Sequence, residues 1–234
     1  MPKISIITTT YKHQNFIAQT IESVLAQTFA DWELLIWDDS PDDETWNIIQ
    51  KYVKKYPDKI KAWHHNPNKW IVENMKFLLS KVSKESDYIA FLEWDDMFTS
   101  DNLEKRINYF KLNNNVKFIY NWYKIIDKYW KIKKNTNIQK WKNFLSFNDF
   151  LDFPTLNPIK SFGCVMLRKE IFNFFYPIRK LNNKKMFWNT DFLCWLKIIE
   201  KWINIYFLDK TIFLYREHDN NYSIWNNNIS MIKE

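Results

Sequence analysis

The first half of the chain alternates between short apolar runs and longer stretches in which apolar residues recur at helical spacing. The apolar runs predict four buried strands, at residues 3–9, 33–36, 60–63 and 88–92. The amphipathic stretches predict three helices, at residues 15–28, from the acidic turn 38–44 to about residue 56, and at 71–82. Asp101 is expected to cap a further helix, because its carboxylate can accept hydrogen bonds from the free amides of a first turn.

Strand–helix alternation of this kind predicts an α/β fold with a mostly parallel sheet that helices cover on both faces. Ligands of such sheets bind outside the carboxyl ends of the strands. Two acidic clusters, Asp38-Asp39 and Glu93-Trp94-Asp95-Asp96, each follow a predicted strand. Both clusters are therefore expected at one rim of the sheet, which is the predicted binding site.

The second half of the chain is less regular. Residues 131–160 are rich in Lys, Asn and Pro and predict loops. Further on, the pattern predicts strands at 163–167, 203–208 and 212–214 and a helix at 189–201. We expect a single two-lobed domain with a division near residue 112.

Composition narrows the class of protein. With 46% hydrophobic and 26% charged residues among 234, the chain is expected to be globular. No run approaches the roughly 18 apolar residues of a membrane-spanning helix, and Met1-Pro2-Lys3 leads into a strand without the apolar core of a signal peptide. Cys164 and Cys194 are too few for a disulfide framework or a structural zinc site. These features predict a soluble, cytoplasmic protein, and its net charge of +7 would favour the inner face of an anionic membrane.

Glycine and tryptophan are used abnormally. Gly163 is the only glycine, where average usage of about 7% would give roughly 16, and there are 13 tryptophans. Several tryptophans stand where the backbone is expected to need glycine. Trp130 lies in a turn between strands, Trp202 follows a helix, and Trp70 lies in a turn before a helix.

One hypothesis explains both anomalies: many of these positions are glycine in the working protein, encoded by UGA codons that another translation table renders as tryptophan. The alternative is a tryptophan-rich surface that stacks on carbohydrate or nucleic acid, but such a surface does not explain the missing turn glycines. UGG codons at positions 70, 94, 130 and 202 would contradict the hypothesis.

The carboxylates of Glu93, Asp95 and Asp96 suit a divalent cation. Acidic side chains at the end of one strand repel one another unless a cation or hydrogen-bond donors offset their charge. Mg²⁺ or Mn²⁺ fits, since such ions prefer oxygen ligands and complete their shells with substrate phosphates. The alternative is a solvated acidic turn, which is the better explanation for residues 38–44 taken alone. The apolar strand before Glu93 and the second cluster on the same rim favour the metal.

Several motifs, in order along the chain, resemble glycosyltransferase family 2. They are Ile6-Ile7-Thr8-Thr9-Thr10-Tyr11, Ile21-Glu22-Ser23-Val24-Leu25-Ala26-Gln27-Thr28, Asp38-Asp39 with Asp43 and Thr45, Asn68-Lys69-Trp70, and Phe91-Leu92-Glu93-Trp94-Asp95-Asp96. The resemblance is clear over residues 3–110 and weaker over 160–223. Glycine at Trp70 and Trp94 would restore the Asn-x-Gly and acidic-Gly-Asp-Asp patterns of that family, in agreement with the UGA hypothesis.

The resemblance implies a GT-A fold, an α/β/α sandwich with a mostly parallel central sheet and a Rossmann-like N-terminal half. In a single domain of that fold, residues 1–112 would be the nucleotide-sugar-binding half and residues 113–234 the acceptor-binding half. The resemblance also implies inverting transfer of a sugar from a nucleotide-diphospho-sugar, expected to be UDP-linked, with Mn²⁺ or Mg²⁺ as cofactor. The expected acceptor is a glycan or lipid-linked molecule in bacterial cell-surface polysaccharide synthesis.

Roles in nucleotide binding follow from the same resemblance. Thr10 and Tyr11 would border the nucleotide at the end of the first strand. Asp39 would hydrogen-bond the base, with Asp38 alongside, and Asn68 would belong to the donor-binding set.

The second acidic cluster and the C-terminal Tyr215-Arg216-Glu217-His218 element would serve the diphosphate. Asp95 would hold the metal, and Asp96 would orient Asp95 or touch the donor sugar. Glu93 stands where the family commonly has Asp, so a ribose or metal contact is the expectation. Arg216 or His218 would bind the diphosphate or complete the metal shell, with His218 as the expected metal ligand.

Inverting transfer needs a general base that deprotonates the acceptor hydroxyl. Asn189-Thr190-Asp191-Phe192, at the start of an amphipathic helix, resembles the Glu-Asp or Thr-Asp segment of the family, so Asp191 is the expected base. Without that resemblance, Asp191 would be explained as a first-turn acid that the helix dipole stabilises.

Three other classes of protein are weighed against a glycosyltransferase. A nucleic-acid-binding protein agrees with the charge of +7, but the lysines are dispersed and no RRM, zinc or helix-turn-helix pattern occurs. A nucleotidyltransferase would be expected to carry a glycine-rich phosphate loop after the first strand, and Thr8-Thr9-Thr10-Tyr11-Lys12 is not one. A carbohydrate-binding module would retain its function without Asp95 and Asp191, whereas a transferase would not.

Overall fold

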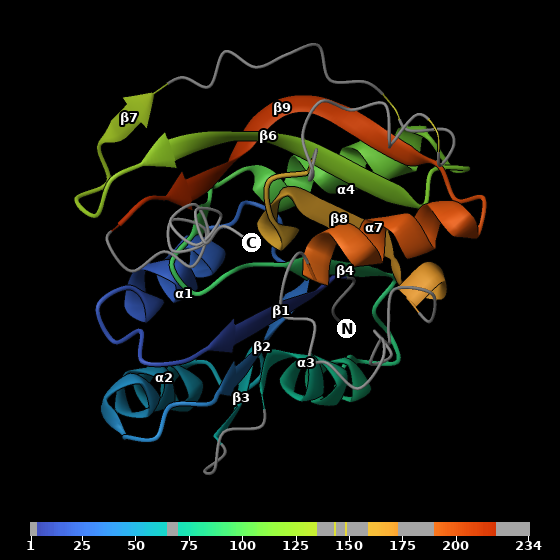
Figure 1. Cartoon of the computed structure of the whole chain (residues 1–234). Coiled ribbons are helices and arrows are strands. Elements are labelled where there is room, and N and C mark those ends of the chain that lie inside the picture. Colours follow the sequence, from blue (N-terminus) through green and yellow to red (C-terminus); the bar gives the residue numbers. More distant parts are fainter. Residues whose placement is uncertain are drawn as a thin grey trace, which may run out of the picture.

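The fold comes from a computed structural model that describes residues 4–64, 70–134, 143, 148, 159–172 and 190–218. These residues form one curled sheet with helices packed around it (Figure 1). The strand order is β3-β2-β1-β4-β8-β6-β9-β5, and β7 pairs with β6.

The N-terminal half contains four parallel strands, as its apolar runs predict. They are β1 (Ile4–Thr10), β2 (Trp32–Asp38), β3 (Ile60–His64) and β4 (Tyr88–Phe91). β1 lies between β2 and β4 and pairs in parallel with both. The carboxyl ends of these three strands therefore lie at one edge of the sheet, where the two acidic clusters begin.

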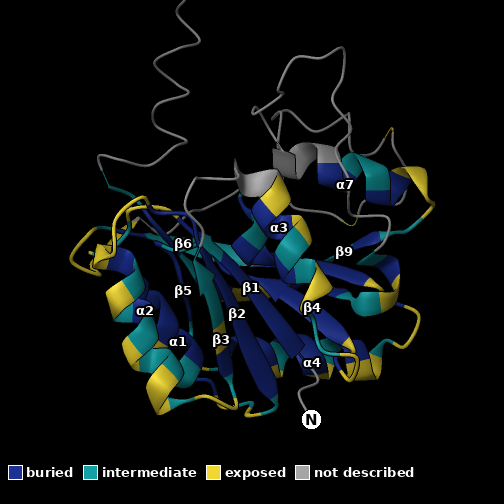
Figure 2. Ribbon diagram, turned by 90° about the horizontal axis from the view of Figure 1, so that it is seen from below, coloured by how far each residue is buried: buried dark blue, intermediate teal, exposed yellow. Residues whose placement is uncertain are grey.

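The helices that connect these strands also lie where the amphipathic pattern predicts them. They are α1 (Ile17–Leu25), α2 (Glu44–Lys55) and α3 (Trp70–Ser80). The further helix expected from Asp101 is α4 (Asn102–Leu112). α3 packs on β1 and β2, and α1 packs against α2. Burial of their apolar faces against the strands, which are buried along most of their length (Figure 2), supplies most of the stability of this half.

The second half makes the sheet mixed. Its strands are β5 (Met97–Phe98), β6 (Phe118–Ile126), β7 (Ile132–Lys134), β8 (Val165–Arg168) and β9 (Ile205–Arg216). β8 runs antiparallel to both β4 and β6, whereas β6 and β9 are parallel. The mostly parallel arrangement thus holds for the N-terminal strands, and the rest of the sheet departs from it.

Some boundaries in this half differ from the predicted ones. The expected strand at 163–167 begins as a 3₁₀ turn, η1 (Phe162–Cys164), and only then becomes β8. The two strands expected at 203–208 and 212–214 form the single long strand β9. A second 3₁₀ turn, η2 (Lys169–Ile171), and α7 (Thr190–Glu200) complete the described elements.

Asp101 stands at the N-cap of α4, but its side chain makes no capping hydrogen bond there. Its carboxylate instead accepts from Thr99 Oγ1 at 2.7 Å and pairs with Lys105 on the first turn. The ammonium of Lys105 lowers the pKa of this carboxyl group. The predicted helix is confirmed, and the predicted capping bond is wrong because two nearer partners compete for the carboxylate.

Cys164 and Cys194 are buried, and no disulfide joins them. Among the described helices, none has the length and apolar character needed to cross a bilayer.

Candidate functional site

The carboxyl ends of the first three strands are joined by backbone and Ser40 contacts. The Asp39 N–H donates to the carbonyl of Thr10 at 3.0 Å, which ties the end of β2 to the end of β1. Ser40 Oγ accepts from the Lys12 N–H at 2.8 Å, and the Ser40 carbonyl lies 2.8 Å from His64 Nε2 at the end of β3. The loop after β1 and the first acidic cluster therefore form one rigid corner.

Asp38 is buried in that corner. Its Oδ1 accepts from the backbone N–H and the hydroxyl of Ser40, while Oδ2 is buried without a hydrogen-bond partner. Burial raises the pKa of the Asp38 carboxyl group, against the lowering effect of the Ser40 hydrogen bonds. Thr10 is buried as well, whereas Tyr11 is 42% exposed and can reach a ligand from the surface.

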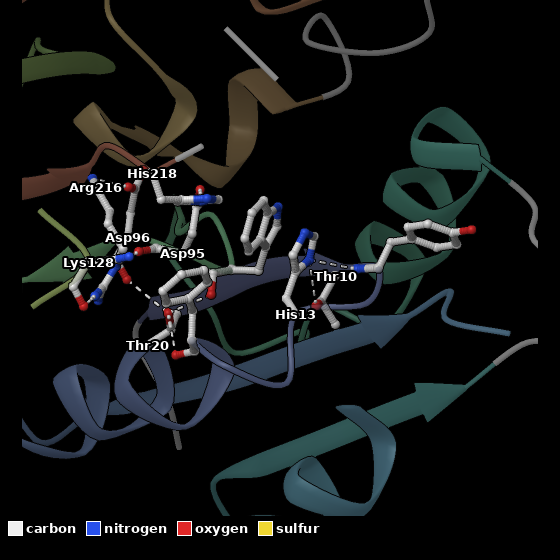
Figure 3. A network of polar contacts seen from close by, with 11 residues as sticks. Thr10, His13, Thr20, Asp95, Asp96, Lys128, Arg216 and His218 are labelled. Atoms are coloured by element: carbon white, nitrogen blue, oxygen red, sulfur yellow. Dashed lines mark hydrogen bonds and ion pairs between the residues drawn. The ribbon is translucent and has the colours of Figure 1, made fainter. Parts of the chain in front are cut away.

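The second acidic cluster follows β4 and meets the end of β9. Asp95 Oδ2 lies 3.1 Å from His218 Nε2, although the two residues are 123 positions apart in the chain. Both side chains are less than one-tenth exposed. Burial raises the pKa of Asp95, while the hydrogen bond and charge of His218 act in the opposite direction. Figure 3 shows this pair within a network of polar contacts, beside Arg216 and Asp96.

Arg216 holds the turn that carries both aspartates. Its backbone N–H donates to Asp96 Oδ1 at 2.7 Å, and its Nε donates to the carbonyl of Asp95 at 2.6 Å (Figure 3). Its guanidinium lies 4.9 Å from the centre of the Phe16 ring. Arg216 is therefore a positioning residue for the acidic turn, and its contact with a diphosphate stays a prediction.

Asp96 is fully buried beside this arginine. Burial, and next the charges of Asp95 and Glu93, raise the pKa of Asp96 well above its ordinary value. One of its oxygens, Oδ2, has no hydrogen-bond partner. An unpartnered buried carboxylate oxygen costs free energy, which a bound cation or hydroxyl would recover.

Thr20 on α1 anchors the same turn from the other side. Its hydroxyl lies 2.8 Å from the carbonyl of Trp94 and 2.9 Å from that of Asp96. The sequence gives no sign that this residue contacts the acidic turn. It belongs to the motif at 21–28 only by adjacency, and a buried threonine on an apolar helix face gives no signal of its own.

Trp94 places its indole against the ring of His13, from the loop after β1. The ring centroids are 2.9 Å apart and the planes are nearly parallel. Burial, and next the charge of His218, lower the pKa of His13 to about 2, so its imidazole is neutral. His13 Nδ1 accepts from the Tyr11 N–H at 3.0 Å and lies 3.2 Å from Thr10 Oγ1.

Glu93 directs its carboxylate toward the second half of the sheet. Oε2 accepts from the Gly163 N–H at 2.8 Å. Arg106, which is fully buried on α4, donates to the Gly163 carbonyl and to Asn121 on β6. Glu93 therefore links β4 to the 3₁₀ turn before β8, and its expected ribose or metal contact stays a prediction.

A divalent metal fits the donor set around Asp95 and His218. A carboxylate oxygen and an imidazole nitrogen lie side by side there, and Mg²⁺ or Mn²⁺ is commonly held by one or two protein groups together with substrate phosphates. The described residues contain no group of three His, Cys, Asp or Glu side chains that would hold a metal alone. The unpartnered Asp96 Oδ2 nearby agrees with a site that a ligand completes.

Two predicted site residues are not part of this geometry. Asn68 lies outside the described residues, and so does the side chain of Asp191, although its backbone belongs to the first turn of α7.

The chain matches the family model described as "Glycosyl transferase family 2" over residues 5–175. This protein belongs to that family. The Escherichia coli enzyme named UDP-Glc:alpha-D-GlcNAc-diphosphoundecaprenol beta-1,3-glucosyltransferase WfgD is 31% identical over 203 residues, which cover 82% of this chain and 75% of WfgD. EpsE of Bacillus subtilis (strain 168) is 35% identical over 106 residues, 45% of this chain and 37% of EpsE.

Solved structures of low identity share the fold. S. aureus TarS 1-349 in complex with UDP-GlcNAc has a TM-score of 0.69 at 18% identity, over 94% of this chain. The mannosyltransferase PcManGT from Pyrobaculum calidifontis, in complex with GDP-Man and Mn²⁺, has a TM-score of 0.69 at 12% identity, over 96% of this chain. The chain spans 60% and 59% of these two structures. The expected GT-A fold is confirmed.

Proposed function

We propose that this protein is a metal-dependent inverting glycosyltransferase. It would take a sugar from a nucleotide-diphospho-sugar, UDP-linked by preference, and transfer it to a glycan or lipid-linked acceptor in cell-surface polysaccharide synthesis. Family membership and the name of WfgD support the reaction class and this acceptor class. The UDP-GlcNAc complex of TarS and the GDP-Man and Mn²⁺ complex of PcManGT support a nucleotide-sugar donor and a metal.

The observation that carries the proposal is the contact between Asp95 and His218. Two potential metal ligands from distant parts of the chain meet in a buried position at the carboxyl end of β4. Burial of a carboxylate and an imidazole costs desolvation free energy. The turn does not need this pair for its stability, because Arg216 and Thr20 already hold it. Asp95 and His218 would hold a divalent ion, and the chemistry that such an ion supplies is neutralisation of the charge on the leaving nucleotide diphosphate.

The chain's own groups supply the other roles. Thr10, Tyr11 and Asp39 border the nucleotide at the corner formed by β1 and β2, and Asp38 supports that corner. Asp96, which has one unpartnered oxygen, would orient Asp95 or touch the donor sugar. Asp191, in the first turn of α7, would accept the proton of the attacking acceptor hydroxyl.

Calorimetric titration of UDP, with and without MnCl₂, tests the nucleotide site. The protein would be measured both with the sequence given and as the Trp94→Gly variant, since the indole lies beside the metal ligands. Binding that requires Mn²⁺ is the expected result. Absence of binding to UDP, GDP and dTDP by folded protein in either condition would contradict the proposal.

Asp191→Ala separates binding from chemistry. We expect it to keep Mn²⁺-dependent UDP binding and to lose sugar transfer by a factor of about 10² to 10⁴, the usual contribution of a general base. The matched variant is Asp191→Glu, which keeps the carboxylate and should retain part of the turnover. Full turnover in Asp191→Ala would remove this residue from the base role.

A further inference from the structure

Three residues other than glycine have a positive φ among the described residues, and two of them are tryptophans. Trp130 has φ 73° and Trp202 has φ 59°. A Cβ in this left-handed region crowds the backbone, so glycine is the usual occupant and a bulky aromatic residue is a genuine exception. Both positions were singled out from the sequence as sites where glycine is expected.

The hydrogen bonds around Trp202 identify the motif that terminates α7. The Ile203 N–H donates to the carbonyl of Ile198 at 3.3 Å, and the Trp202 N–H donates to that of Ile199 at 2.9 Å. These are the 6→1 and 5→2 bonds of a Schellman motif, in which residue 202 is the left-handed C′ position that glycine normally fills. The indole gains little in return, because Trp202 is 87% exposed.

Trp130 occupies a comparable place in the hairpin between β6 and β7. Asp127 closes the turn: its N–H donates to the carbonyl of Lys131 at 2.9 Å, and its carbonyl accepts from the Trp130 N–H at 3.1 Å. The positive φ is therefore required by the turn. The side chain is 46% exposed and contacts Arg216 only at 5.8 Å from the ring centre.

Trp94 conflicts with its surroundings through its side chain. Its ring centroid lies 2.9 Å from that of His13, whereas parallel rings in van der Waals contact need about 3.5 Å. His218, 5.7 Å away, borders the indole as well. The backbone of residue 94, in contrast, is well placed, with its carbonyl 2.8 Å from the Thr20 hydroxyl.

Two other positions show that the fold distinguishes places for glycine from places for tryptophan. Gly163, the only glycine of the chain, is required, since a Cβ there would lie 2.7 Å from Glu93 Oε2 and closer still to Phe213. Trp195 is a well-packed tryptophan, fully buried with edge-on contacts to Phe118 and Phe162. The fold needs glycine at more positions than one, and it also needs at least one true tryptophan.

We propose that positions 94, 130 and 202 carry glycine in the working protein, inserted at UGA codons, and that position 195 carries tryptophan. Lys12 shows that a positive φ alone does not demand glycine: at φ 57° it is held by the Ser40 contact. The three tryptophans differ from Lys12 because each position has its own reason to carry glycine. The reason is the Schellman motif at 202, the closed hairpin at 130 and the short ring-to-ring distance at 94.

Glycine at 94 has a consequence for the site, which rests on the proposed function. Without the indole, the space between His13 and His218 opens directly beside Asp95. The diphosphate and sugar of the donor would then have room at the candidate metal ligands. Residue 94 thereby decides whether the donor can reach the metal ligands.

Peptide mass spectrometry of the protein isolated from its native cells, together with the codons of its gene, tests the residues directly. We expect glycine and UGA at 94, 130 and 202, and tryptophan and UGG at 195. Tryptophan at 94, 130 and 202 would overturn the inference whatever the enzyme does.

Thermal unfolding of variants tests whether the positive φ at positions 130 and 202 disfavours a residue with a Cβ. Trp202→Gly and Trp130→Gly should raise the midpoint of unfolding, whereas Trp195→Gly should lower it. Trp202→Ala is the matched control, since it removes the indole but keeps the Cβ, and it should show less gain than Trp202→Gly. An equal or larger gain for Trp202→Ala would remove the backbone argument.

Binding of UDP with MnCl₂ to Trp94→Gly, compared with the parent chain, tests the consequence for the site. We expect at least a tenfold gain in affinity. Glycine in the native protein combined with no binding by folded Trp94→Gly would retain the inference and contradict the proposed function. Tryptophan in the native protein combined with metal-dependent UDP binding would contradict the inference and retain the proposed function.

Discussion

The two acidic clusters follow neighbouring parts of one sheet, yet they are built in different ways. Asp38, after β2, has one carboxylate oxygen held by Ser40, only two residues further along the chain. Asp95 and Asp96, after β4, depend on Arg216 and His218, about 120 positions away. The first cluster is local, and the second exists only when β9 is in place.

This difference indicates which cluster can respond to a ligand. The Asp38 carboxylate is held by its own turn, so we expect it to keep its position when a nucleotide binds at the corner of β1 and β2. The Asp95–His218 pair joins the two halves of the fold, so a group that binds both residues also binds the halves together. Mutations in the two clusters should therefore separate metal binding, stability and nucleotide affinity.

Asp95→Asn is expected to have the largest effect. The amide keeps the size and one acceptor oxygen but loses the charge that attracts a divalent ion, so Mn²⁺-dependent UDP binding should fall by about 100-fold or more. Calorimetry with and without MnCl₂ measures this loss. Folding is checked by the unfolding midpoint, which should change little because removal of a buried charge lowers the desolvation cost.

Arg216→Gln should have the largest effect on stability. Its Nε bond to the Asp95 carbonyl would be lost, and the buried carboxyl groups of Asp95 and Asp96 would lose a neighbouring positive charge. We expect a loss of about 3 kcal/mol in the free energy of unfolding, measured with urea. The comparison variant is Lys105→Gln, which breaks an exposed ion pair with Asp101 and should cost less than about 1 kcal/mol. Similar losses for both variants would contradict the positioning role of Arg216.

Thr20→Val tests the anchor on α1. The change keeps the shape of the side chain and removes the hydroxyl that contacts the carbonyls of Trp94 and Asp96. A loss of about 1–2 kcal/mol in the free energy of unfolding is expected, since those buried carbonyls lose a partner. Thr20→Ser keeps the hydroxyl and should recover part of that loss. If Ser were as unstable as Val, packing of the methyl group would be the cause.

The same contrast between local and distant contacts explains how far the sequence predicts this structure. β1 to β4 and α1 to α3 were predictable because each shows its own pattern of apolar residues, and parallel pairing follows from strand–helix alternation. The start of α4 was predictable from Asp101. The 3₁₀ start of β8 and the short strand β5 were not. Both depend on partners far along the chain, Glu93 for Gly163 and β9 for Met97–Phe98.

In the candidate site, too, local features were predictable from the sequence and contacts between distant residues were not. The acidic clusters could be placed on the rim from their position after apolar strands. The pairing of Asp95 with His218 needed the family resemblance, because no spacing relates two residues 123 positions apart. Thr20, His13 and Arg106 escaped prediction, since nothing in the neighbouring sequence distinguishes them from ordinary polar residues until their partners are known.

Asp38→Asn should have the smallest effect and sharpen the comparison. The Asn oxygen can still accept from Ser40, so the corner should keep its shape, and UDP affinity should fall by less than about tenfold without loss of the Mn²⁺ requirement. Because burial raises the pKa of Asp38, the folded state holds this proton more tightly than the unfolded chain, and the parent should lose stability as pH rises above the ordinary value of 3.8. Asp38→Asn lacks that titration, so urea unfolding at pH 4 and pH 7 should favour the variant more at pH 7. Loss of the Mn²⁺ requirement in Asp38→Asn would mean that the two clusters act as one metal site, and the contrast between them would fail.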